Sequence, residues 1–104
     1  MRKLKDVAKI IRSKNSGPFE LTLDVIFADD EMFEKASRSK IITKDRIAEI
    51  YGIDRDTIID IIEYPVARAI KTTLVRPIAS GALGERDVYG AQQHAPLMEM
   101  EVDL

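Results

Sequence analysis

A ten-residue stretch near the end of the chain, VYGAQQHAPL at positions 88–97, gathers side chains that could do chemistry. It holds the only histidine, His94, and both glutamines, Gln92 and Gln93; the one other side-chain amide is that of Asn15. An imidazole titrates near working pH and can act as a general acid or base. Neighbouring amides add uncharged donors and acceptors. We therefore predict a site here, with a histidine that only braces the loop as the alternative.

Two further residues of this stretch bear on its chemistry. Asp87 is a candidate to orient His94, as the third member of a triad does, and it is equally able to cap the loop. Tyr89 is expected to anchor the loop and to reach a partner with its hydroxyl. The chain has no cysteine, and no serine lies in a recognisable nucleophile context, so a hydrolase triad is not predicted. The predicted catalytic pair is His94 with Asp87.

A second polar segment, RSKNSGPF at 12–19, carries Arg12, Ser13, Lys14 and Asn15. A glycine-containing turn with lysine and serine can hold a phosphate or a carboxylate. The segment lacks the GxxxxGK[ST] spacing of a nucleotide-binding loop. The alternative is a solvated helix end, where cations suit the helix dipole.

Farther along, Arg76 offers a planar guanidinium that could clamp a carboxylate or pair with an acid across a sheet. Gly81, in the same VRPIASG stretch, lets the backbone turn sharply or approach a ligand. A metal site is not predicted, because one histidine and no cysteine leave only carboxylates as ligands. The acidic cluster at 29–31 is better explained by helix capping. No cofactor is expected.

Composition narrows the class of protein. With 104 residues, the chain is expected to form one domain, residues 1–104. The formal net charge of −2 gives no pull toward nucleic acid or an anionic membrane. No apolar run approaches the roughly 20 residues of a membrane span, and the basic N-terminus does not resemble a signal peptide. We expect a cytoplasmic protein that binds neither nucleic acid nor membrane.

Local patterns predict the elements that must position these residues. Apolar residues at helical spacing predict an amphipathic helix over 4–13. Strict alternation predicts a strand over 19–27, with Phe19 on its apolar face. Asp29 or Asp30 can cap a helix over 30–38, and Thr43 can cap a second over 44–51 that stops at Gly52.

The second half is predicted to be mainly strands. The segment 57–64 has the spacing of a helix face, but its β-branched residues and Pro65 favour a strand. Further strands are predicted at 69–75 and 97–104, separated by a long ordered loop over 76–96. The order predicts an α+β fold: a mostly antiparallel sheet with helices on one face, as a ferredoxin-like variant with the long loop before its last strand.

The segments VAKIIRSKNSGPFELTLDVIF, IAEIYGI, AIKTTLVRPIASG and DVYGAQQHAPL together resemble a family of small proteins built on a domain of unknown function. Members of that family are typically encoded beside, or fused to, a larger protein similar to AtuA, the acyclic terpene utilisation protein. The resemblance adds Ser80 to the predicted ligand-binding residues. It also implies an AtuA-like partner that works on carboxylic acids or their CoA thioesters.

Three functions follow as hypotheses. The first is a small accessory subunit of a metabolic complex with an AtuA-like partner. The second is a free-standing lyase, hydratase or isomerase that uses His94 as its acid or base. The third is a non-catalytic module that binds a carboxylate or CoA. Under each, open sheet edges favour a homo-oligomer or a hetero-oligomer.

Overall fold

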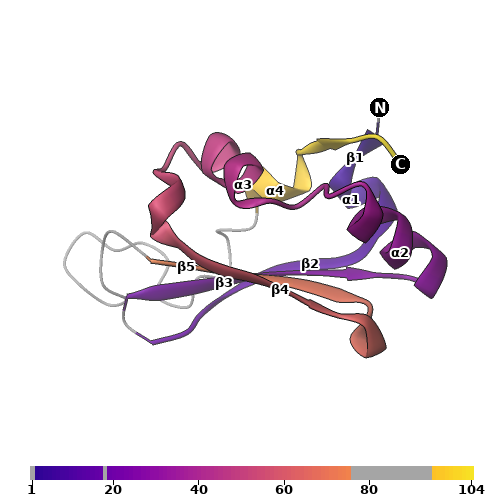
Figure 1. Cartoon of the computed structure of the whole chain (residues 1–104), viewed down its shortest axis with the longest axis horizontal. Coiled ribbons are helices and arrows are strands. Elements are labelled where there is room, and N and C mark those ends of the chain that lie inside the picture. Colours follow the sequence, from indigo (N-terminus) through magenta and orange to yellow (C-terminus); the bar gives the residue numbers. More distant parts are fainter. Residues whose placement is uncertain (1, 18, 76–94) are drawn as a thin grey trace.

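A computed structural model of the chain describes residues 2–17, 19–75 and 95–104, and its centre is a four-stranded antiparallel sheet (Figure 1). The strands β2 (Ala8–Asn15), β3 (Glu20–Phe27), β4 (Ile58–Tyr64) and β5 (Ala69–Val75) lie in the order β2-β3-β5-β4. Strand β3 shows why the sheet forms here: Leu21, Leu23, Val25 and Phe27 alternate along it and are all buried. Phe19 precedes the strand and is exposed, so its predicted place in the core is wrong.

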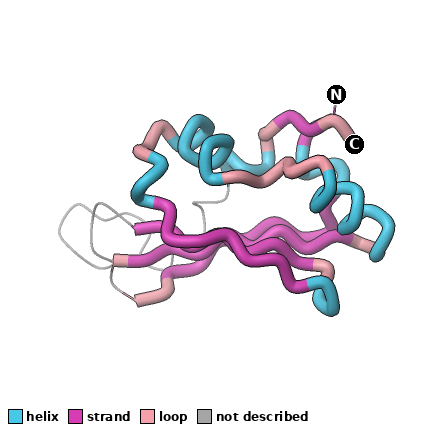
Figure 2. The backbone as a smooth tube through the Cα atoms, viewed as in Figure 1, coloured by secondary structure: helices cyan, strands magenta, loops and turns pink. Residues whose placement is uncertain are grey.

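Helices cover one face of this sheet (Figure 2). Helix α2 (Asp30–Arg38) begins where Asp29 accepts a hydrogen bond from the backbone N–H of Met32 at 2.8 Å. Helix α3 (Lys44–Tyr51) begins where Thr43 accepts one from Arg46 at 3.2 Å and ends at Gly52 in the left-handed region. These caps confirm the predicted starts of both helices and the predicted end of α3. A short 3-10 helix, η1 (Arg55–Thr57), leads into β4.

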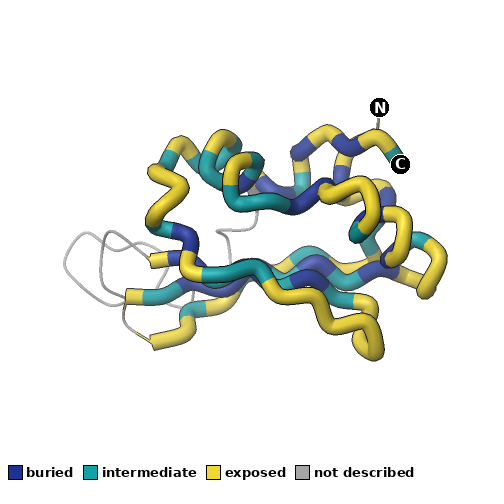
Figure 3. The backbone as a smooth tube through the Cα atoms, in the orientation of Figure 1, coloured by how far each residue is buried: buried dark blue, intermediate teal, exposed yellow. Residues whose placement is uncertain are grey.

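Residues from the two ends of the chain form a second, smaller sheet, which lies on the same side of the main sheet as the helices (Figure 1). Strand β1 (Arg2–Lys3) pairs antiparallel with β6 (Glu101–Val102). The one-turn helix α1 (Leu4–Val7) follows β1 directly, and the one-turn helix α4 (Ala95–Met98) precedes β6. The core is continuous through this layer, because Leu4, Leu97 and Val102 are at most 1% exposed. Figure 3 shows the buried backbone segments of the two layers facing each other.

The α+β class is confirmed, with an antiparallel main sheet and helices on one face. The connectivity is two hairpins: β2 turns into β3, and β4 turns through η2 (Pro65–Ala67) into β5. Both α2 and α3 lie in the connection between the hairpins. This order differs from the β-α-β-β-α-β sequence of a ferredoxin-like fold, because no helix separates β2 from β3.

The helix predicted over 4–13 is wrong beyond its first turn. Helix α1 ends at Val7, and the chain continues as β2. The register between β2 and β3 shifts between Ala8 and Ile10, which is a β-bulge. A bulge inserts one extra residue, so Ala8 and Ile11 both turn toward the core although they are three apart. That spacing imitates one face of a helix.

The strand predicted over 97–104 is also largely wrong. Residues 95–98 form α4, and only Glu101–Val102 is a strand. Met100 and Val102 are buried as predicted, whereas Met98 and Leu104 are half-buried. The predicted alternation holds only from Met100 to Val102. Before it, Leu97 is also buried, because the helical turn of α4 does not have the period of two of a strand. The predicted strands at 57–64 and 69–75 are confirmed as β4 and β5.

Candidate functional site

The predicted ligand-binding residues Arg12 to Asn15 lie on a strand, not at the end of a helix, and they alternate between its faces. Arg12 is paired with Asp24, and Lys14 with Thr22, on the face that carries no helix. Ser13 and Asn15 lie opposite Leu23 and Leu21, which belong to the core. The four residues therefore divide between the two faces of the sheet, and they cannot all contact one ligand.

The helix-free face has a row of charged groups at its centre. The Nε of Arg12 donates to the Asp24 carboxylate at 3.1 Å, and the Arg12 side chain is 61% exposed. Lys71 on β5 lies opposite Asp24 from the other side. Neighbouring side chains on paired strands are about 5 Å apart at Cβ, so two cations flank one carboxylate. Lys71 is not among the residues predicted from the sequence, although the alternation of 69–75 places it on the polar face.

The next row on this face contains Lys14, Thr22, Thr73 and Asp60. The Thr22 hydroxyl donates to the backbone carbonyl of Lys14 at 3.2 Å, and Thr22 is buried. Among the described residues, Asp60 Oδ1 finds no hydrogen-bond partner although it is buried. This row begins with a lysine at one edge of the sheet and ends with an aspartate at the other.

The polar segment 12–15 and the end of β5 lie at the same end of the sheet. Asn15 pairs with Leu21, which pairs on its other side with Leu74. Val75, the last described residue before position 76, pairs with Glu20. Adjacent strands lie about 4.8 Å apart, so Asn15 and Leu74 are separated by about 10 Å.

Helix α4, which begins one residue after His94, is held firmly in the helix layer. Leu97 is 1% exposed and packs in the core with residues of α1 and α3. Burial raises the pKa of the Tyr51 phenol, and a hydrogen bond with the backbone of Leu97 acts in the opposite direction. Tyr51 thus ties the end of α3 to α4.

The remaining predicted site residues lie outside the described residues, and their assignments stay predictions. These are the predicted catalytic pair, Asp87 and His94, and the predicted ligand-binding residues Arg76, Ser80, Gly81, Tyr89, Gln92 and Gln93. The predicted ordered loop falls in the same part of the chain, except for its last two residues, which begin α4.

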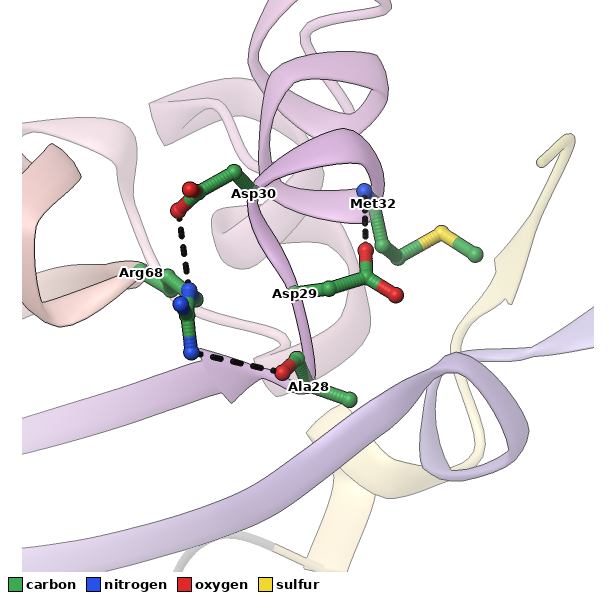
Figure 4. Close-up of polar contacts among 5 residues, drawn as sticks. All are labelled: Ala28, Asp29, Asp30, Met32 and Arg68. Atoms are coloured by element: carbon green, nitrogen blue, oxygen red, sulfur yellow. Dashed lines mark hydrogen bonds and ion pairs between the residues drawn. The ribbon is translucent and has the colours of Figure 1, made fainter.

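A groove of about 740 Å³ lies between α2 and the β4–β5 hairpin. Its end is formed by Arg68, which adopts the left-handed region with φ of 54°. Arg68 Nε donates to Asp30 at 2.8 Å, and its Nη1 donates to the carbonyl of Ala28 at 3.4 Å (Figure 4). A hydrogen bond to the Asp30 carboxylate, and the charge of that carboxylate, raise the pKa of Arg68.

Two other residues that line this groove are hydrogen-bonded to each other. The Ser37 hydroxyl lies 2.8 and 2.9 Å from the two oxygens of Glu63. No sequence pattern predicts the groove, because its walls come from segments more than 25 residues apart. The pairs Asp30–Arg68 and Ser37–Glu63 join α2 to the hairpin across this groove, so we assign it a structural role: it fastens α2 to the hairpin.

In the part of the chain that the structure describes, no group of three or more His, Cys, Asp or Glu side chains is arranged to hold a metal ion. Within the same ranges, no helix combines the length and the apolar character needed to cross a membrane.

Comparison with known proteins places the chain in a family. Neither the curated proteins nor the solved structures contain a match to it. A family model does match, over residues 4–101, which is nearly the whole chain and includes all four strands of the main sheet. The chain therefore belongs to the family described as "Domain of unknown function (DUF4387)".

Proposed function

We propose that this domain is a small accessory subunit of a metabolic complex, and that it contributes polar groups to a site for a carboxylic acid or an acyl-CoA. The larger partner would be an AtuA-like protein. The observation that carries the proposal is the row Arg12–Asp24–Lys71 on the helix-free face of the sheet. Two cations beside a single carboxylate leave one positive charge for an anionic ligand.

The shape of this face supports the role of a subunit. The row lies on an open sheet, with its members on three adjacent strands. Ligand sites bury roughly 70–90% of a small molecule's surface, and a sheet face covers a ligand from one side only. A second surface must complete the enclosure, and an AtuA-like partner would supply it. Arg12, whose side chain is 61% exposed, is well placed to contact that surface.

Co-expression of this chain with an AtuA-like protein tests the proposal. We expect the two proteins to elute together at micromolar concentration and the complex to bind acyl-CoA. The Lys71→Gln variant should keep the complex intact and weaken acyl-CoA binding roughly 10- to 150-fold, because a hydrogen bond to a charged group contributes about 1.5–3 kcal/mol.

The matched control is Lys35→Gln, which removes an exposed lysine of α2 on the other side of the molecule. It should bind acyl-CoA like the unmodified complex. The proposal fails if the two proteins migrate separately, or if the Lys71 and Lys35 variants bind with equal affinity.

A second candidate function is a non-catalytic carboxylate-binding or CoA-binding module, because the same row of charges needs no reacting group. This module would bind its ligand without a partner. A thermal-shift screen of the isolated chain with organic acids and acyl-CoAs separates the two functions. Binding at about 100 times the dissociation constant adds ~2.7 kcal/mol to stability. A response of the isolated chain, lost in Lys71→Gln, would favour the module.

A further inference from the structure

The two edges of the main sheet have opposite character. Strand β2, at one edge, carries Lys9, Arg12 and Lys14 and no acidic residue. Strand β4, at the other edge, carries Asp60 and Glu63 and no basic residue. Both strands pair on one side only among the described residues. One sheet thus ends in a basic edge and an acidic edge.

The edges also differ in how they are protected. Natural edge strands commonly use lysine and other charges to discourage pairing with another chain. Strand β2 fits that pattern apart from Ile10, which is 40% exposed, whereas β4 exposes three apolar side chains: Ile59 is 44% exposed, Ile62 41% and Tyr64 43%. Contiguous exposed apolar side chains of this kind mark interaction sites on protein surfaces.

We propose that β4 of one copy of this chain pairs antiparallel with β2 of a second copy, head to tail. The strand directions permit it. Each neighbouring pair in the order β2-β3-β5-β4 is antiparallel, so β2 and β4 run in opposite directions. A second copy placed beside the first in the same orientation therefore presents its β2 antiparallel to β4. The helices of both copies then lie on the same side.

One register continues the rows of the sheet from copy to copy. Asp60 closes the row that Lys14 begins, Ile62 closes the row of Arg12, and Tyr64 closes the row of Ile10. Hydrogen-bonded and non-hydrogen-bonded pairs alternate across each row of an antiparallel sheet. Four strands bring this alternation back into phase, so the backbone groups of β4 match those of β2 in the second copy.

The side chains match in the same register. Asp60 faces Lys14 of the second copy, an opposite-charge pair. Tyr64 faces Ile10 of the second copy, which is itself 40% exposed. Ile62 faces the aliphatic stem of Arg12. Cross-strand pairs of these kinds each contribute roughly 0.2–1 kcal/mol. Pairing of β4 with another β4 would instead bring four carboxylates to one interface, and β2 with β2 would gather six cations.

The interface is heterologous, because each copy contributes two different edges. Such contacts close into a ring or extend into a chain. The proposal goes beyond the accessory role. It assigns Lys14, which is not part of the proposed acyl-CoA site, to the contact between two copies. It concerns the chain alone, so it can fail while the complex with an AtuA-like protein forms, and the reverse also holds.

Two variants test the head-to-tail geometry. Ile62→Lys blocks the β4 edge and leaves β2 intact, while Lys14→Asp blocks the β2 edge and leaves β4 intact. By sedimentation velocity, we expect the unmodified chain to form species larger than its 11.7 kDa monomer at about 100 μM. Each variant alone should be monomeric, with at least a tenfold weaker association. An equimolar mixture should form a 1:1 heterodimer, because one intact β2 edge meets one intact β4 edge.

Controls keep the outcome clear. Glu49→Lys, on the exposed face of α3, should associate like the unmodified chain. Combining Asp60→Lys with Lys14→Asp in one chain should restore association. If circular dichroism shows that Ile62→Lys does not fold, Tyr64→Lys blocks the same edge. An unmodified chain that stays monomeric, a Lys14→Asp variant that still dimerises, or a mixture without heterodimer would each overturn the proposal.

Discussion

Lys40 and Gly52 occupy equivalent positions after helices α2 and α3. After α2, the N–H of Lys40 bonds to the carbonyl of Ser37, and that of Ile41 bonds to the carbonyl of Ala36. After α3, Gly52 and Ile53 make the same two bonds. This is the Schellman motif, which needs a left-handed residue, and both positions have it, with φ of 49° and 63°.

We predict that Lys40→Gly stabilises the domain. A left-handed residue with a side chain is strained by about 1–2 kcal/mol, and part of the gain is offset by the greater freedom of glycine in the unfolded chain. The free energy of unfolding should rise by roughly 0.5–1 kcal/mol in urea denaturation.

The matched change is Gly52→Ala, which should lower the free energy of unfolding by about 1 kcal/mol. An added Cβ at Gly52 meets nothing within 4 Å, so the cost is conformational and not a clash. Changes of the same sign in the two variants would contradict this account of the helix ends.

Glu99 links the two ends of the chain. Its carboxylate lies 2.7 Å from the ammonium of Lys3 and 3.0 Å from that of Lys5. Hydrogen bonds from these lysines, Lys3 first, lower the pKa of Glu99 from its ordinary value of 4.5. The same contact raises the pKa of Lys3 from 10.5. Both shifts mean that the charged pair favours the folded state.

The sign of each shift sets a pH window. Because the folded pKa of Glu99 is lowered, its contribution is present above pH 4.5 and is lost as pH falls through the folded value. Because the folded pKa of Lys3 is raised, its contribution is present below pH 10.5 and is lost as pH rises farther.

We expect Glu99→Gln to be less stable than the unmodified chain inside this window and equally stable in acid. Salt should shrink the difference, since these groups are exposed. A difference that persists at pH 2 in urea denaturation would refute the ion-pair explanation, and Glu49→Gln, on the exposed face of α3, serves as the control.

At the scale of elements, the sequence predicted the helix starts, the end of α3 and strand β3 correctly, because their signals are local. The caps at Asp29 and Thr43, the stop at Gly52 and the alternation of β3 were all readable in the sequence because each acts within a few residues. Strand β2 was misread because its bulge spaces Ala8 and Ile11 as a helix would. No local pattern could reveal the pairing of β1 with β6, whose partners are about a hundred positions apart.

The candidate site shows the same limit. The residue types in the 12–15 segment were recognisable, but their division between two faces depends on whether the segment is a strand or a helix. Lys71 was missed because its value comes only from the register that places it beside Asp24. Sequence thus identified polar groups, and sheet order decided which of them meet.

At the scale of the whole molecule, the two ends of the chain complete the core and do not hang from it. Leu4 and Val102 are at most 1% exposed, and Met100 is 3% exposed. The backbone N–H of Leu4 donates to the carbonyl of Met100 at 2.8 Å. We therefore expect the small terminal sheet to unfold together with the main sheet.

Two valines in different environments test whether the terminal sheet and the main sheet unfold together. Val102 lies in the terminal sheet and is 1% exposed, while Val66 at the tip of the β4–β5 hairpin is fully exposed. Val102→Ala removes buried methyl groups and leaves a cavity, so it should lower the free energy of unfolding by about 2 kcal/mol. Val66→Ala should change it by less than about 0.5 kcal/mol. Urea denaturation should follow a single transition in both variants, with an unchanged m-value. If Val102→Ala instead produces a second, earlier transition, the terminal sheet is an independent unit, and the core does not extend from the main sheet through both ends of the chain.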